Sequence, residues 1–282
     1  MLKRLQLIAM AMEISKQEFE EILSVATSSH VEVYDKVKPH FSVSYNECKA
    51  DVLGAVGTSA AEDEQHAALT ADVKRWVALQ AFLAVFRQLD LVLTPTGFGV
   101  ISTNQMAPAS KQRVDALVGH LRDSALRAHG QLLSSLCQLS GWGATDQAKE
   151  NITTLFYDFR MLQKMQGPAV SHLDWQAAQR LIAEADETLR LKLSPQYMDH
   201  LLEAVRSGSV SADDKPIIFQ CRHIINLWVC GDQDAVKLKM RRLLSQLDAD
   251  LEKYAIYGEF GYPVNHHENF QNTQDSPAYI FG

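Results

Sequence analysis

The residues of this chain that could perform chemistry are few, and they form no familiar catalytic or metal-binding pattern. His266-His267-Glu268 comes nearest to a metal-ligand cluster. Adjacent side chains on an extended chain point in opposite directions, so neighbouring histidines are poorly placed to bind one ion. We expect this triplet to lie at the surface or in a docking contact, with metal binding as the weaker alternative.

Carboxylates gather at two further places in the chain. Asp213-Asp214 form one pair, and Asp248, Asp250 and Glu252 form a second group. Neither group has the ligand spacing of a calcium loop. Surface charge or helix N-terminal charge is the simpler interpretation of both.

Isolated histidines and glycines complete the search for chemical motifs. His120, His129 and His200 lie within helical patterns, where histidines of the core or surface are common. Gly97-Phe98-Gly99 lacks the third glycine and the parallel-sheet context of a dinucleotide fingerprint. No phosphate-binding loop and no nucleophile elbow occurs. We therefore predict no catalytic residue, no cofactor and no enzymatic activity.

Composition restricts the class of protein further. The 282 residues carry a net charge of −7, which disfavours a general phosphate-backbone binder, and we expect no sequence-specific nucleic-acid partner. No apolar run approaches the ~20 residues of a membrane span. Lys3 and Arg4 precede a short apolar run, but the acidic Glu13 follows. We therefore interpret this segment as the first turns of a helix or a loose leader, in preference to a signal peptide. The four cysteines form no CxxC pair, and we expect mostly buried thiols.

Helical periodicity dominates the elements that would position these residues. Ser15 and Glu18 have the spacing of a capping box at the start of the first helix. Two long helices are predicted from about 62 to 89 and from about 108 to 139, each ~40 Å long at ~1.5 Å per residue. A compact connector joins them, which favours an antiparallel pair. A third helical run is predicted over 146–166.

Gly167-Pro168 is the clearest break in the helical pattern. Further helices are predicted over 174–193, 195–206, 216–229 and 232–257. Periodicity is lost from Gly258, although the segment stays rich in aromatic residues, unlike a disordered tail. We therefore predict an N-terminal helical domain (1–166) with an inserted hairpin, a C-terminal helical subdomain (167–257) and an extended aromatic tail (258–282). The tail would dock on its own subunit or on a neighbouring copy.

A β-hairpin is predicted between the two long helices, at about 91–101. Leu91-Val92-Leu93 and Phe98-Gly99-Val100-Ile101 are β-prone and flank Thr94-Pro95-Thr96-Gly97. Pro95 presets φ within a turn, and Gly97 supplies a position of positive φ. Because a two-stranded hairpin is marginal alone, it must pack on the helices or pair with another chain. Packing on the helices is favoured, and pairing between subunits remains the alternative.

The segment LVLTPTGFGVISTNQMAPASKQRVDALVGHLR resembles an uncharacterised family encoded in Bacteroidales phages and prophages. The segments ISKQEFEEI, VKPHF and NTQDSPAYIFG are similar to further parts of that family, whereas residues 1–12 depart from it as a start-site extension would. The resemblance implies a virion structural role of the head–tail connector or adaptor type. It implies a homo-oligomeric ring, other virion structural proteins as partners, and a location in the bacterial cytoplasm or the virion.

The sequence therefore predicts a mainly α multi-helix bundle with two long antiparallel helices, one short β-hairpin and an extended aromatic tail. The predicted function is non-enzymatic structural assembly through protein–protein contacts. A helical module that binds a peptide or small ligand is the alternative, and an enzyme without a recognisable motif is a weaker one. The candidate interaction residues are Pro95, Thr96, Gly97, Phe98, Phe260, Tyr262, Phe270, Tyr279 and Phe281.

Overall fold

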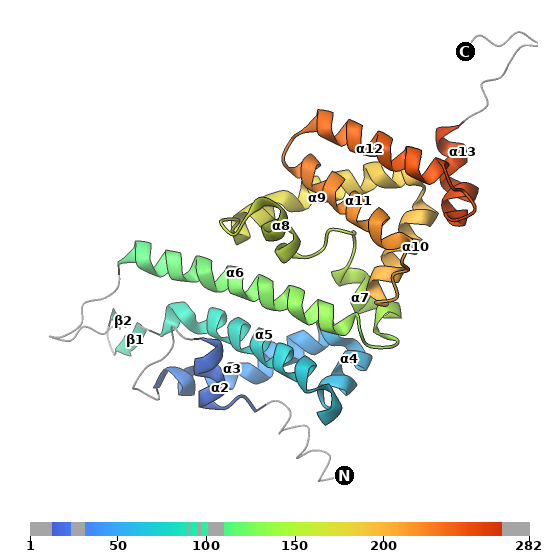
Figure 1. The fold of residues 1–282 in the computed structure, drawn as a ribbon. Helices are drawn as coiled ribbons and strands as arrows, with labels where there is room; N and C mark the ends of the chain where they lie inside the picture. Colours follow the sequence, from blue (N-terminus) through green and yellow to red (C-terminus); the bar gives the residue numbers. More distant parts are fainter. Residues whose placement is uncertain (1–12, 24–31, 90, 95–96, 101–109, 267–282) are drawn as a thin grey trace, which may run out of the picture. The chain divides into compact units, whose positions relative to one another are not determined.

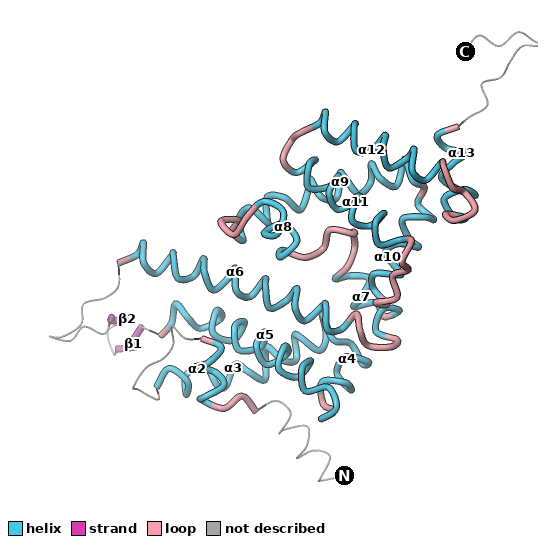
Figure 2. The backbone as a smooth tube through the Cα atoms, viewed as in Figure 1, coloured by secondary structure: helices cyan, strands magenta, loops and turns pink. Residues whose placement is uncertain are grey.

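The computed structural model describes residues 13–23, 32–89, 91–94, 97–100 and 110–266. These residues are mainly helical, as predicted (Figure 1 and Figure 2). The α-helices are α2 (Lys16–Ile22), α3 (Glu32–Cys48), α4 (Gly54–Ala61), α5 (Ala67–Val85), α6 (Lys111–Leu136), α7 (Asp146–Asn151), α8 (Phe159–Gln166), α9 (His172–Leu193), α10 (Pro195–Arg206), α11 (Asp214–Val229), α12 (Gln233–Asp248) and α13 (Tyr262–Asn265). Short 3-10 helices are η3 (Glu64–His66), η4 (Phe86–Gln88) and η5 (Trp142–Ala144), and π turns are η2 (Lys49–Leu53) and η6 (Tyr257–Gly261).

The chain divides into two compact units. Unit 1 comprises Met1–Ala178 with Val205–Ser209, and unit 2 comprises Gln179–Ala204 with Val210–Gly282. This division passes through α9 and α10, whereas the sequence suggested a boundary between residues 166 and 167. The three predicted segments remain a prediction about which parts of the chain fold independently.

In unit 1, α5 and α6 lie side by side and run in opposite directions (Figure 1). Asp72 near the start of α5 accepts a hydrogen bond from Ser135 near the end of α6, at 2.6 Å. Arg87, just after α5, pairs with Asp115 near the start of α6, at 3.5 Å. These two contacts at opposite ends of the pair fix its antiparallel direction.

Aromatic packing attaches α2 to the same bundle. The capping box of Ser15 and Glu18 is confirmed, since each side chain bonds the other residue's backbone N–H. The helix that it starts buries Phe19, which is 1% exposed. The Phe19 ring lies 5.8 Å from Phe41 of α3 and 6.0 Å from Phe82 of α5, centroid to centroid. Offset and edge-on pairs of this kind add to the free energy of apolar burial.

The π turn η2 interrupts the helix between α3 and α4. A π turn releases backbone carbonyls from the regular helical hydrogen bonds, so these oxygens need other donors. The side chains of Trp142, Gln147 and Asn151 supply those donors. Trp142 bonds the carbonyl of Val52 at 3.2 Å, Gln147 that of Ala50 at 3.1 Å, and Asn151 that of Asp51 at 2.7 Å. η2 is thereby held against η5 and α7.

The single helix predicted over 146–166 is wrong. The chain forms α7 and α8, separated by a loop over 152–158 that Figure 2 shows in pink. Two contacts end one helix and start the next. Arg206 donates two hydrogen bonds to the carbonyl of Ile152, at 2.9 and 2.6 Å. Asp158 caps α8 by accepting from the N–H of Arg160 at 2.9 Å.

Unit 2 is built from the later part of α9, from α10 to α12, and from the turns that follow. Its core is apolar, with Ile217 and Leu243 fully buried. Tyr197 of α10 packs on Tyr257, with ring centroids 5.8 Å apart. Ser194 accepts a hydrogen bond from the N–H of Tyr197 at 3.2 Å, so it caps α10.

The predicted extended tail from residue 258 is wrong for its first eight residues. η6 and α13 continue the helical structure to Asn265. Asn265 donates to the carbonyls of Lys192 at 2.6 Å and Gly261 at 3.2 Å, which ties these turns to the end of α9. This contact joins residues far apart in sequence, so local periodicity does not reveal it. Residues 267–282 lie outside the described residues.

Two short strands follow η4. Strand β1 (Leu91–Thr94) and strand β2 (Gly97–Val100) are antiparallel, with Leu91 opposite Val100 and Thr94 opposite Gly97. Pro95 and Thr96 lie outside the described residues, so the predicted turn chemistry stays a prediction.

Candidate functional site

A pocket in unit 1 is bordered by α2, α5, α6 and the start of α8. Its volume is about 460 Å³, within the range of ordinary ligand pockets. We call it the arginine pocket, because three of its residues are Arg75, Arg127 and Arg160. The remaining lining residues are Ile22, Leu23, Asp72, Leu79, His120, Leu121, Ser124, Ala128 and Gln131.

Helical spacing brings the polar residues of the pocket together. Ser124, Arg127 and Gln131 follow one another at three and four residues on α6, so they share one face of that helix. Asp72 and Arg75 are likewise three residues apart on α5. The facing sides of two antiparallel helices thus form the walls.

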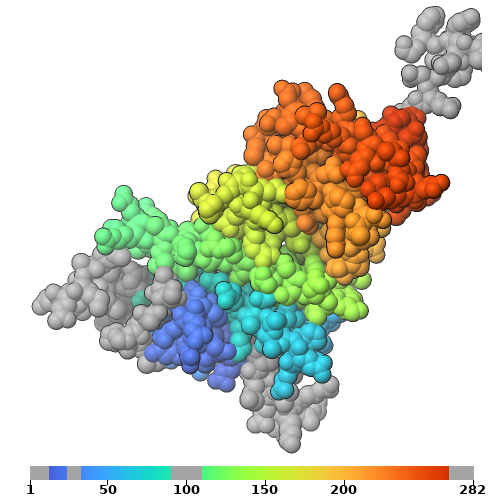
Figure 3. Space-filling view, viewed as in Figure 1, coloured from blue at the N-terminus to red at the C-terminus, as the bar shows by residue number. Residues whose placement is uncertain are grey.

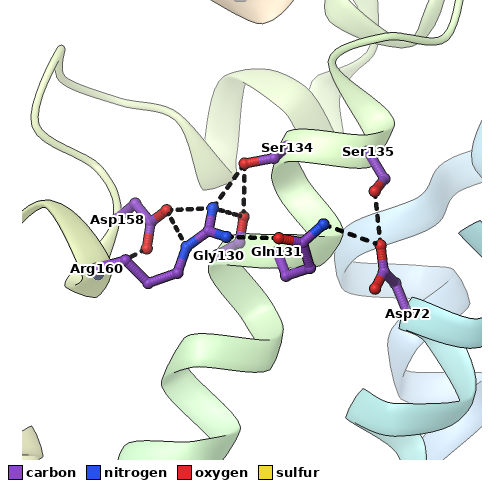
Figure 4. Close-up of polar contacts among 7 residues, drawn as sticks. All are labelled: Asp72, Gly130, Gln131, Ser134, Ser135, Asp158 and Arg160. Atoms are coloured by element: carbon purple, nitrogen blue, oxygen red, sulfur yellow. Dashed lines mark hydrogen bonds and ion pairs between the residues drawn. The ribbon is translucent and has the colours of Figure 1, made fainter.

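Arg160 is the most firmly held of the three guanidinium groups. It pairs with Asp158, whose side chain is only 4% exposed, at 2.7 Å. It also donates to the carbonyl of Gly130 and to the hydroxyl of Ser134, each at 2.6 Å, and to Gln131 Oε1 at 2.7 Å. Figure 4 shows these donors converging from the start of α8 onto α6. A buried carboxylate of this kind is stable only when it is paired in this way.

The same network extends to α5. Gln131 accepts from Arg160 through its carbonyl oxygen and points its amide at Asp72, at 3.5 Å. Ser135 donates to the same oxygen of Asp72 at 2.6 Å (Figure 4). The carboxylates of Asp72 and Asp158 are therefore both satisfied by neighbouring protein groups. The space-filling view shows the side chains of α6 and α8 in direct contact (Figure 3).

Arg75 and Arg127 differ from Arg160. Among the described residues, no carboxylate lies within 4 Å of either guanidinium group. Arg127 is half-buried and bonds the hydroxyl of Ser124 at 3.0 Å, and Arg75 is exposed. The pocket therefore offers two guanidinium groups above an apolar surface. This combination favours a ligand that carries both a negative charge and an apolar or aromatic group.

A smaller pocket of about 220 Å³ lies in unit 2 and contains Tyr197, His200, Ser211 and Asp214. His200 and Ser211 both contact the same carboxylate oxygen of Asp214, at 3.3 and 2.6 Å. Ser211 also accepts from the N–H of Asp214 at 2.9 Å, as a helix-capping residue does. In a Ser-His-Asp triad the nucleophilic serine donates its hydroxyl hydrogen to the histidine. Here Ser211 donates to the carboxylate of Asp214.

Two of the buried cysteine thiols, those of Cys48 and Cys221, are not activated. Cys48, Cys137 and Cys221 are buried. Burial raises the pKa of Cys48 and of Cys221 to about 12, so both thiols stay protonated near neutral pH. Within the described ranges, no group of three histidine, cysteine or acidic side chains is placed to hold a metal ion. His267 and Glu268 of the predicted triplet lie outside those ranges.

The candidate interaction residues that the structure describes do not line the arginine pocket. Gly97 and Phe98 belong to β2, and Phe260 and Tyr262 lie in the turns η6 and α13. Phe260 is 38% exposed, whereas the Tyr262 ring stacks on His266 at 4.0 Å between centroids. The remaining candidates, Pro95, Thr96, Phe270, Tyr279 and Phe281, lie outside the described residues.

The pocket was missed in the sequence because its residues come from separate helices. The one available signal was the polar row on α6 beside its apolar stripe. Such a row is usually a solvated helix face, and only the packing of α2, α5 and α8 turns it into a pocket wall.

Comparison with known proteins adds a family match but no activity. Residues 33–152 match the model of a family described as "Family of unknown function (DUF6712)". The match runs from α3 to the end of α7, so it contains the α5 and α6 walls of the pocket but not Arg160. No curated protein and no solved structure matches the chain. Among the helices that the structure describes, none is long and apolar enough to cross a membrane.

Proposed function

We propose that this protein is a non-enzymatic structural assembly protein of a phage or prophage particle, similar to head–tail connector or adaptor subunits. Its partners would be other virion structural proteins and further copies of itself in a ring, in the bacterial cytoplasm or in the virion. The proposal rests first on the resemblance of the segment around Pro95-Thr96-Gly97 to the phage-encoded family. A helical bundle with short connecting elements is compatible with such a subunit.

The pairing of β1 with β2 is the single observation that best supports an assembly role. Within the described residues, the two strands form a sheet with no third strand. Each strand therefore has one edge without a β partner among those residues, and such an edge is a template for pairing with another chain. In the sequence the two strands lie between α5 and α6.

The chain beyond His266 supplies the second candidate contact. Asn265 anchors the preceding turns through the carbonyl of Lys192, and the segment 267–282 follows His266 in the sequence. Phe270, Tyr279 and Phe281 are the kind of side chains that fill pockets at protein–protein contacts. Asn265 belongs to the folded part, so a deletion that tests the segment should begin at residue 267.

Deletion of residues 267–282 should impair assembly while leaving the fold stable. Within the described residues, the hydrogen bonds that anchor η6 and α13 come from residues up to His266, so the unfolding midpoint in urea should stay close to that of the full chain. Native mass spectrometry and electron microscopy of the purified protein, alone and with neighbouring virion proteins, would measure assembly. As a control, deletion of residues 262–282 removes the Asn265 anchor and should lower the unfolding midpoint as well.

Normal assembly of the 267–282 deletion would remove the tail from the mechanism. Rings or complexes that are absent even for the full chain, with all candidate partners present, would contradict the assembly function itself.

A ligand-binding helical module is the second candidate function, and the arginine pocket is the observation that favours it. A monomer that binds a small anionic compound in this pocket, and forms no higher assembly with virion proteins, would support it over the structural role. Isothermal titration with aromatic carboxylates measures the binding, and native mass spectrometry measures the oligomeric state.

A further inference from the structure

We propose that the arginine pocket receives the segment 267–282 of a neighbouring copy of this chain. The inference deepens the proposed assembly function and rests on it, because it names the surface on which that segment docks. The pocket and the segment complement each other in charge, and the segment supplies aromatic side chains that guanidinium groups can bind.

The segment has a composition that complements the pocket. Residues 267–282 contain two acidic residues, Glu268 and Asp275, and no lysine or arginine. They also contain three aromatic rings, those of Phe270, Tyr279 and Phe281. The segment thus combines carboxylates and aromatic groups within a short stretch of chain.

The pocket provides the matching groups. Arg75 and Arg127 have no carboxylate within 4 Å among the described residues, so they can pair with one from outside. Guanidinium groups bind carboxylates through two parallel hydrogen bonds and also stack on aromatic faces. Leu79, Leu121 and Ala128, which are 3%, 2% and 4% exposed, line the pocket beside them, so an aromatic side chain that enters it meets apolar neighbours.

The size of the pocket limits what enters it. A volume of about 460 Å³ is that of a small-ligand site, so one aromatic side chain with a neighbouring carboxylate fits, and the whole segment does not. The rest of the segment would act as a tether. At ~3.3 Å per residue, the sixteen residues 267–282 could span at most roughly 50 Å.

A contact of this kind leads naturally to a ring. The pocket belongs to unit 1 and the segment to unit 2, so the contact would join two different parts of the chain. Copies joined pocket to segment make a head-to-tail contact, which repeats from subunit to subunit and closes when the rotation between them divides a circle.

Photo-crosslinking of the full chain tests this placement directly. Tyr279→p-benzoylphenylalanine, and separately Phe270→p-benzoylphenylalanine, would be prepared unlabelled and with ¹⁵N, mixed in equal amounts and irradiated. We expect crosslinked peptides that combine one labelled and one unlabelled partner, with the acceptor within Asp72–Leu79 or His120–Gln131. Acceptors elsewhere in the chain, or crosslinks within a single isotope only, would overturn the proposal.

Charge reversal on α6 supplies a matched test. Arg127→Glu should reduce the yield of the mixed crosslink about tenfold, because it replaces attraction with repulsion. Arg122→Glu is the control: it makes the same change at an exposed position of α6 outside the pocket, and should leave the yield unchanged. Increasing the NaCl concentration from about 50 to about 500 mM should lower the yield for the unreversed chain. Equal yields from the two reversals would contradict the proposal.

The variants must be compared as folded proteins. Circular dichroism and the urea midpoint establish this, and Arg75→Glu, at an exposed position, replaces Arg127→Glu if the latter does not fold. The crosslinks also separate the docking site from the proposed function. Rings that form without a pocket crosslink leave the assembly role standing and remove the docking site. A pocket crosslink without assembly into virion complexes removes the assembly role and leaves the docking site.

Discussion

Gly130 lies where α6 packs against Asp158, the residue that precedes α8. A Cβ at this position would overlap the carboxylate of Asp158. That carboxylate cannot easily move away, since it caps α8 and pairs with Arg160. The hydrogen bond from Arg160 to the carbonyl of Gly130 holds the two backbones together. The absence of a side chain at Gly130 is therefore what admits the buried ion pair.

Gly130→Ala should destabilise the protein by about 1–3 kcal/mol, because the added methyl group displaces a paired and buried carboxylate. Gly119→Ala on the same helix is the matched control, since its Cβ would meet only His172, at an ordinary 3.6 Å. That variant should be neutral or stabilising by about 0.5–1 kcal/mol, because alanine favours the helix. Urea unfolding followed by circular dichroism measures both. Equal stabilities of the two variants would contradict the close packing at Gly130.

His129 precedes this glycine and is turned toward α7. Its Nε2 lies 3.1 Å from Asn151 Oδ1. Because the Asn151 amide already donates to two carbonyls, its oxygen is the free acceptor, and Nε2 of His129 is the donor. Burial lowers the pKa of His129 below its ordinary 6.5, although the Asn151 bond and the charge of Asp158 act in the opposite direction.

The free energy of unfolding should therefore decrease as the pH falls below about 6.5. In this range His129 is protonated more readily in the unfolded chain than in the folded protein, where its pKa is lower. Above pH 6.5 this contribution is fully present. His129→Gln cannot titrate, so its urea midpoint should change less between about pH 7.5 and about pH 5.5. His120→Gln makes the same change at an exposed position of α6 and is the control. Identical profiles for all three proteins would rule out this role for His129.

At the scale of elements, the π turn η2 organises unit 1. Three consecutive carbonyls, those of residues 50–52, accept hydrogen bonds from the side chains of Trp142, Gln147 and Asn151. These donors come from η5 and α7, about 90 to 100 residues later in the chain. Asn151 also contacts His129, so α6 joins the same arrangement. The family match over residues 33–152 contains this whole arrangement.

Trp142→Phe should cost about 1–3 kcal/mol, because it leaves the buried carbonyl of Val52 without a donor. Its indole is fully buried, so some packing is lost as well. Trp76→Phe makes the same chemical change at a half-buried position of α5 and should cost less. Thermal unfolding followed by calorimetry compares the two. A larger loss at Trp76 would show that the bond to η2 contributes little.

At the scale of the whole molecule, unit 1 depends on residues from far along the chain. Arg206 bonds the carbonyl of Ile152, and a Cβ at Gly143 would overlap the backbone of Arg206. A chain ended at residue 166, the predicted domain boundary, would lose both contacts. The segment 267–282 and the arginine pocket belong to different units, so a contact between them in neighbouring copies would couple both units to assembly.

Features set by neighbouring residues were predictable from the sequence. The capping box at Ser15, the cap at Ser194 and the long helices α5 and α6 all follow from local spacing. The physical reason is that caps and helical periodicity involve residues only three or four positions apart. The mainly helical fold was therefore predicted correctly.

Features set by distant partners were decided only by the tertiary structure. The predicted helix over 146–166 is interrupted at Ile152, whose carbonyl accepts hydrogen bonds from Arg206. The turns after residue 257 are anchored by the hydrogen bond from Asn265 to the carbonyl of Lys192. The arginine pocket likewise needs Arg75, Arg127 and Arg160 from three separate helices. Their spacing in the sequence predicts only exposed polar faces. Packing those faces against one another turns three unrelated arginines into one site, and no local pattern records that packing.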